Sequence, residues 1–154
     1  MNAYTQQYQQ NSILTASPEQ ILILLYDGAI RFTRQAMMGI ESDNSAQKYE
    51  GVRRAMAIIA EFANTLDHNV GGEIAADLDA LYAYMNKELT QANLNNDIEK
   101  LKVVEGLLVD LRQTWVEAIE VARNEATVPA SQPAKAPQPA QGLPENYKPL
   151  SAAG

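Results

Sequence analysis

Apolar side chains recur at intervals of three and four residues along four long stretches of this sequence. This spacing places them on one face of an α-helix. The first stretch, for example, carries Leu22, Leu25, Ala29, Phe32 and Ala36. Short polar segments separate the stretches, so neighbouring helices should run antiparallel. The pattern therefore predicts an all-α protein built as an up-down-up-down four-helix bundle.

Capping signals give the expected helix boundaries. Ser17 is suited to the N-cap, Pro18 to the first helical position, and Gln20 can complete a capping box. The pair Gly71-Gly72 indicates a break after the second helix. Asn96 with Glu99 resembles another cap. We expect helices over about 17–40, 45–67, 73–93 and 96–126.

Composition divides the chain into three parts. Residues 1–16 are polar with a few apolar side chains, and residues 17–126 hold the helical pattern. Residues 127–154 contain every one of the seven prolines except Pro18, mixed with Ala, Gln and Ser. Such a segment has little to bury, so we expect a disordered tail.

The helices carry more apolar residues than one core seam requires. Each expected seam has a second apolar stripe beside it. Part of this surplus is ordinary for bundle helices, but together it indicates a surface that can accept a partner. On the second, third and fourth helices the seams consist of Tyr49, Val52, Met56, Ile59, Ala63 and Leu66, of Ala75, Leu78, Tyr82, Met85, Leu89 and Ala92, and of Leu101, Val104, Leu108, Leu111, Trp115, Ala118 and Ala122. The second stripe consists of Ile23, Tyr26, Ile30 and Met37 on the first helix and of Ile58 and Phe62 on the second. It consists of Ile74, Leu81 and Tyr84 on the third helix and of Val103 and Leu107 on the fourth.

Charge and apolar run length exclude several classes of function. The formal net charge is −7, from 12 basic and 19 acidic residues. The basic residues are scattered, which argues against binding nucleic acid or an anionic membrane surface. The longest apolar run, Ile21 to Tyr26, is far short of the ~20 residues that span a bilayer. The N-terminus does not resemble a secretory signal, so we expect a cytosolic protein without membrane insertion.

No residue pattern indicates catalysis, a metal site or a cofactor. Cysteine is absent, and the single histidine, His68, is expected at a helix end. Di-iron bundles need repeated Glu-x-x-His motifs, and Thr65 stands three residues before His68. The sequence favours a protein that binds another protein. A cofactor-binding bundle that uses His68 remains the alternative, and an absorption spectrum would separate the two.

Two stretches also resemble the flagellar secretion chaperone FliS family. The first runs from Tyr8 to Phe32 and contains "TASP" and "LLYDGA"; the second runs from Leu81 to Trp115. The resemblance covers about residues 4–125. It implies an antiparallel helical bundle in the bacterial cytosol that binds the C-terminal segment of newly made flagellin. Binding would prevent premature polymerisation and keep flagellin competent for export.

The resemblance also implies a role for the N-terminal segment. In this family it can cover part of the hydrophobic binding surface as a cap, which here would involve Tyr4, Tyr8, Ile13 and Leu14. We further expect a monomer or weak homodimer, and other flagellar export components as additional partners. Together with the second stripes, the expected partner-binding residues are Tyr8, Ile13, Leu14, Ile58, Phe62, Leu81 and Tyr84.

Truncation tests the expected tail. Removing the residues after Thr127 should leave the helical content and the unfolding midpoint nearly unchanged, because the removed segment has little apolar surface to bury. Circular dichroism with thermal unfolding measures both. A large fall in the midpoint would show that the tail packs on the bundle and that the domain boundary is misplaced.

Overall fold

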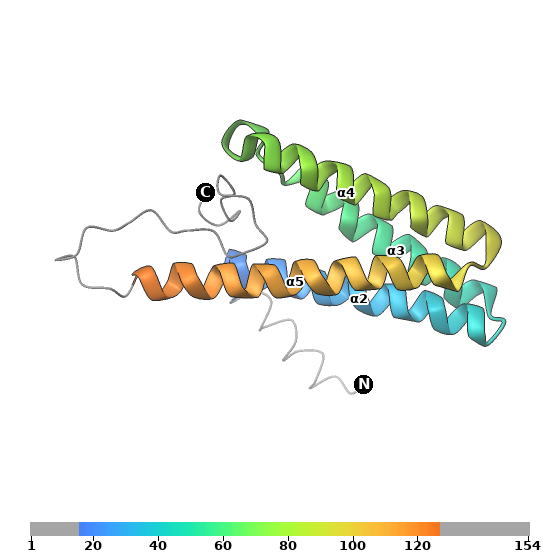
Figure 1. The fold of residues 1–154 in the computed structure, drawn as a ribbon. Coiled ribbons are helices and arrows are strands. Elements are labelled where there is room, and N and C mark those ends of the chain that lie inside the picture. Colours follow the sequence, from blue (N-terminus) through green and yellow to red (C-terminus); the bar gives the residue numbers. More distant parts are fainter. Residues whose placement is uncertain (1–15, 127–154) are drawn as a thin grey trace.

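The computed structural model describes residues 16–126, and these form an antiparallel four-helix bundle (Figure 1). In order, the helices are α2 (Pro18–Glu41), α3 (Ser45–Asn64), α4 (His68–Asn95) and α5 (Ile98–Ala126). Helix α2 packs against both α3 and α5, and α4 packs against the other sides of α3 and α5. Helices α4 and α5 lie close where a short turn joins them and diverge toward the opposite end of the bundle (Figure 1). The expected fold is confirmed for this part of the chain, whereas the N-terminal segment and the tail lie outside it.

An aromatic cluster forms the centre of the core, with one ring from each helix described. Tyr26 of α2 stacks on Phe62 of α3 at a centroid distance of 4.3 Å, and Phe62 lies 5.5 Å from the ring of Tyr82 on α4. The Tyr26 and Tyr82 hydroxyls are hydrogen-bonded at 2.8 Å, and Trp115 Nε1 of α5 donates to the Tyr26 hydroxyl at 3.2 Å. Burial raises the pKa of Tyr26 to about 12, although the hydrogen bonds from Tyr82 and Trp115 oppose part of that rise. Tyr26 is therefore neutral at physiological pH.

Two glycines allow α2 and α3 to approach closely. A Cβ atom added at Gly51 would lie 2.6 Å from the carbonyl oxygen of Phe32 and 2.7 Å from the backbone nitrogen of Ala36. A Cβ added at Gly39 would lie 2.4 Å from the backbone nitrogen of Lys48. At these positions the two helix backbones are in contact, so only glycine fits without separating the helices.

The capping box predicted at the start of α2 is confirmed. Ser17 Oγ accepts from Gln20 N at 3.2 Å, and Gln20 Oε1 accepts from Ser17 N at 2.9 Å. Asn44 caps α3 by accepting from Gln47 N at 3.0 Å. Each bond satisfies a backbone donor that the first helical turn leaves free.

The boundaries on either side of α4 differ in part from the prediction, and α3 ends at Asn64 where 67 was expected. The break predicted over 68–72 is present at Gly72, whose φ of 51° and ψ of −124° are non-helical and kink the chain there, so that the long helical part of α4 follows Gly72 as predicted. A helical turn precedes the kink, because Asp67 accepts from the backbone N–H groups of Asn69 and Val70. His68 lies in this preceding turn and is exposed. At the other end, Asn96 terminates α4 in the left-handed region with φ 53°.

The start of α5 depends on the residue after the one predicted. Asp97 Oδ1 accepts from Glu99 N at 3.1 Å and from Lys100 N at 3.4 Å. An Asn-Asp pair offers two candidate caps, and the backbone conformation of Asn96 assigns it to the end of α4.

The division between seam and second stripe was also partly wrong. Tyr26, Ile30, Phe62 and Ile74 were expected in second stripes, yet all four are buried. Tyr49 was expected in a seam and is 57% exposed. Both stripes satisfy the helical period, so periodicity alone does not reveal which of them faces the centre.

Substitution of the glycines tests the close helix contact. Gly51→Ala should lower stability by roughly 1–3 kcal/mol, because the new methyl group forces α2 and α3 apart. Gly106→Ala is the matched control, since nothing lies within 4 Å of a Cβ at that exposed position of α5. Alanine there should be neutral or stabilising by up to about 1 kcal/mol. Denaturant unfolding measures both variants, and equal effects would contradict the close contact.

Candidate partner-binding surface

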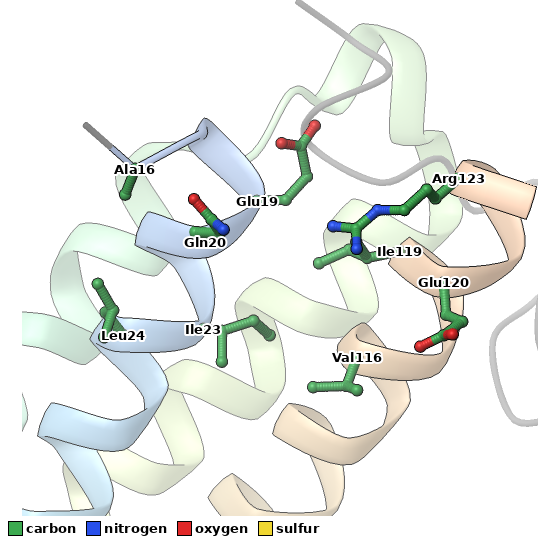
Figure 2. A pocket seen from close by; sticks show the side chains of 9 residues that line it. All are labelled: Ala16, Glu19, Gln20, Ile23, Leu24, Val116, Ile119, Glu120 and Arg123. Carbon is green, nitrogen blue, oxygen red and sulfur yellow. The ribbon is translucent and has the colours of Figure 1, made fainter. Parts of the chain in front are cut away.

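An apolar hollow lies between the first turns of α2 and the last turns of α5. Its volume is about 540 Å³. Ile23 of α2 and Val116 and Ile119 of α5 point into it, with Leu24 beside them (Figure 2). Polar and charged side chains surround this apolar floor, so the hollow can accept an apolar side chain while its rim contacts polar groups. The polar and charged lining residues are Glu19, Gln20, Glu120 and Arg123.

A second hollow of about 390 Å³ opens between α2, α3 and α5. It shares Glu19 and Ile119 with the first, so the two adjoin. Its apolar lining includes edges of Phe62 and Trp115, which connects the surface to the aromatic core. The lining residues are Pro18, Glu19, Ile21, Leu22, Leu25, Glu61, Phe62, Thr65, Trp115 and Ile119.

The predicted partner-binding residues of the bundle differ in how far the structure buries them. Ile58 is half-buried against α2, and its Cδ1 atom would lie 3.3 Å from a Cβ at Gly28. Phe62 is only 2% exposed, so most of its ring serves the core. Leu81 is half-buried against the core and Tyr84 is 45% exposed. Tyr8, Ile13 and Leu14 lie outside the described residues.

The four bundle residues do not line one groove. Leu81 and Tyr84 share a stripe of α4 with Glu88, because the positions are three and four residues apart. Glu88 accepts a hydrogen bond from Lys100 of α5 at 3.2 Å, so this stripe lies on the α5 side of α4. Ile58 lies on the α2 side of α3. Of the four, only Phe62 lines a hollow described above. Their role in binding stays a prediction.

Sequence reasoning missed two apolar residues of α5, Val116 in the first hollow and Ile119 in both. Val116 and Ile119 were placed in neither apolar stripe. The available signal was their spacing of three residues beside the seam residues Trp115 and Ala118. Periodicity could not show that these side chains face the first turns of α2 and line hollows there.

The described residues offer no site for a metal ion. Within residues 16–126, His, Asp and Glu side chains nowhere gather in a group of three or more. In the same part of the chain, none of the helices combines the length and apolar character needed to cross a membrane. The chemical features of the surface are thus apolar hollows with charged rims.

Comparison with known proteins identifies the family. Fold and surface define a helical bundle that presents open apolar hollows. A family model described as flagellar protein FliS matches residues 1–122. The chain belongs to the FliS family, as its sequence motifs predicted.

Relatives from distant bacteria support the same assignment. The flagellar secretion chaperone FliS of Bacillus subtilis (strain 168) is 41% identical over 124 residues, which cover 80% of this chain and 91% of the relative. The flagellar secretion chaperone FliS of Salmonella typhimurium is 37% identical over 116 residues, covering 75% and 86%. The flagellar secretion chaperone FliSB of Pseudomonas aeruginosa is 35% identical over 113 residues, covering 71% and 90%.

Proposed function

We propose that this protein is a flagellar export chaperone that binds the C-terminal segment of newly made flagellin. By occupying that segment, it prevents premature polymerisation and keeps flagellin competent for export. Membership of the FliS family, whose relatives carry the name flagellar secretion chaperone, is the observation that carries the proposal. The protein acts by binding and not by catalysis, in the cytosol, as a monomer or weak homodimer. Other flagellar export components are further partners.

The apolar surface around α2 supports a role in binding an unfolded segment. Two adjoining hollows flank the first turns of this helix, and Ile21 and Leu24 are exposed there. A client segment that becomes helical can place apolar side chains at i, i+3 and i+4 into such hollows. Neither hollow requires the bundle to open, because its wall is the surface of packed helices.

The positions of Ala16 and Pro18 support the proposed role of the N-terminal segment as a cap. Ala16 lines the first hollow and Pro18 lines the second, so residues 1–15 join the bundle at the edge of both. Apolar side chains at Tyr8, Ile13 and Leu14 are near enough in sequence to reach this surface. Because the segment is tethered beside this surface, it can compete with the client for the surface, and no further molecule is needed.

A peptide from the C-terminus of flagellin tests the proposed function. The chain has a single tryptophan, and Trp115 lines the second hollow, so a tryptophan-free peptide should change its fluorescence on binding. Ile58→Ala should weaken binding by about 5- to 30-fold while nearly preserving the unfolding midpoint, because the side chain is half-buried. Phe62→Ala should instead lower stability by roughly 3–5 kcal/mol.

Val103→Ala is the matched control for Ile58→Ala. Val103 is an exposed apolar residue of α5, whereas Ile58 lies on α3 beside Gly28 of α2, so truncation of Val103 should leave binding at the wild-type value. If the wild-type protein binds no flagellin C-terminal segment, including that of its own organism, the proposed function is wrong.

Deletion of the N-terminal segment tests the cap. Without residues 1–12, the client should bind more tightly, because a competed site loses affinity by the fraction of time that it is covered. The uncovered surface should also bind more of a hydrophobic dye. Titration of the peptide and of the dye measures both effects, and unchanged values for both would show that the segment is not a cap.

A further inference from the structure

An aromatic ring on the outer face of α2 and α3 has two guanidinium groups beside it. The Cζ atom of Arg31 lies 5.0 Å from the centroid of the Phe32 ring, and that of Arg54 lies 5.4 Å from the same centroid. Arg31 comes from α2 and Arg54 from α3, so the cluster bridges the two helices. A guanidinium beside a ring still presents N–H donors at its edge, which suit a carboxylate.

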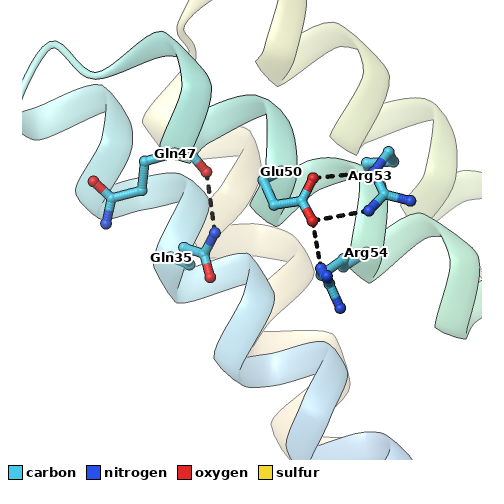
Figure 3. A network of polar contacts seen from close by, with 5 residues as sticks. All are labelled: Gln35, Gln47, Glu50, Arg53 and Arg54. Atoms are coloured by element: carbon cyan, nitrogen blue, oxygen red, sulfur yellow. Dashed lines mark hydrogen bonds and ion pairs between the residues drawn. The ribbon is translucent and has the colours of Figure 1, made fainter.

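These arginines belong to a larger positive cluster. Arg53 and Arg54 both donate to Glu50, at 2.8 Å and 2.5 Å (Figure 3). Their hydrogen bonds lower the pKa of Glu50 to about 2, so this carboxylate is ionised at physiological pH. Within residues 16–126, Arg31 takes part in no ion pair. Arg31, Arg53 and Arg54 carry three positive charges and Glu50 carries one negative charge. The cluster is therefore a positive patch on a chain whose formal net charge is −7.

An apolar surface continues directly from this cluster. Gly28 leaves a notch in α2, where the Cδ1 atom of Ile58 and the Nη2 atom of Arg31 would lie 3.3 Å and 4.0 Å from an added Cβ. Leu24, one turn before Gly28, is 44% exposed. Glu61 follows one turn after Ile58 on α3, so the positive charge is confined to the Arg31 end of the surface.

A hollow on the other side of Arg31 leaves room for a bound segment. Its volume is about 620 Å³, and Asp27, Arg31 and Arg34 all line it. Asp27 is paired with Arg112 of α5. Arg34 is already paired with Glu105 of α5 at 2.6 Å, so Arg31 is the cation there that is available to a ligand. Gln35 Nε2 donates to the carbonyl oxygen of Gln47 at 3.3 Å and closes the far end between α2 and α3 (Figure 3).

From this arrangement we infer that the α2/α3 face recognises an acidic amphipathic segment of the client, binding a carboxylate between Arg31 and Arg54 and an apolar side chain against Ile58. The inference rests on the proposed function and specifies the chemistry of the segment bound there. Charge complementarity carries it, because the positive patch attracts acidic side chains of the segment, whereas the acidic remainder of the protein repels them and so favours binding at the patch. The apolar half then supplies the contact that salt does not screen.

Neutralising the two arginines tests this inference with the flagellin C-terminal peptide as the probe. The double variant Arg31→Gln/Arg54→Gln should bind about 5- to 20-fold more weakly at low salt, because two charge-assisted contacts are lost. The difference from wild type should shrink as the salt concentration rises. The variant should keep the wild-type unfolding midpoint, since both side chains are exposed and Arg53 still pairs with Glu50.

The matched control removes the same charge elsewhere. Lys87→Gln/Lys102→Gln neutralises two exposed cations, on α4 and α5, and should bind within about twofold of wild type. Replacing the Asp and Glu residues of the peptide by Asn and Gln should weaken binding to wild type but not further weaken binding to the arginine variant. If both double variants weaken binding equally, or if neither weakens it, the inference is wrong. Binding of the peptide by the wild-type protein would in that case still support the proposed function. Absence of any wild-type binding would overturn the proposed function and, with it, this inference.

Discussion

The contact among Tyr26, Phe62, Tyr82 and Trp115 sets how the helices of the described bundle face one another. Each ring comes from a different helix, and two hydrogen bonds converge on the Tyr26 hydroxyl. Apolar packing alone tolerates rotation of a helix about its axis, because neighbouring apolar side chains can replace one another. Hydrogen bonds inside a core do not tolerate such a rotation, since a rotated tyrosine leaves buried polar atoms without partners. The cluster thus specifies one packing among several that the apolar stripes would allow.

The binding surface follows from how α2 is held. Gly39 and Gly51 bring its second half against α3, and Asp27 pairs with Arg112 of α5. Its first turns lie beside the last turns of α5, at the end of the bundle where α4 and α5 diverge (Figure 1). Side chains of these first turns line both hollows. The proposed binding of an unfolded segment needs this combination, in which a packed core supports an apolar surface that stays open.

The same geometry explains why the candidate site was harder to predict than the fold. Ile58 was selected because it lies beside a seam, and the structure places it half-buried next to Gly28. Phe62 was selected by the same rule and lies in the aromatic core. Leu81 and Tyr84 fall on the α5 side of α4, away from Ile58. Positions on separate helices have no fixed relation in the sequence, so only the packing decides which of them share a surface.

The sequence by itself determined the local structure of residues 17–126 and the family. Ser17, Pro18 and Gln20 start α2 through hydrogen bonds within a single turn, and the motifs around "TASP" and "LLYDGA" predicted the FliS family that comparison then confirmed. The tertiary structure decided the rest, including which apolar stripe is core and where hollows and charged patches form. The physical reason is distance along the chain: a cap or a helical period acts over a few residues, whereas the Tyr26 hydroxyl meets Tyr82 and Trp115 from 56 and 89 residues away.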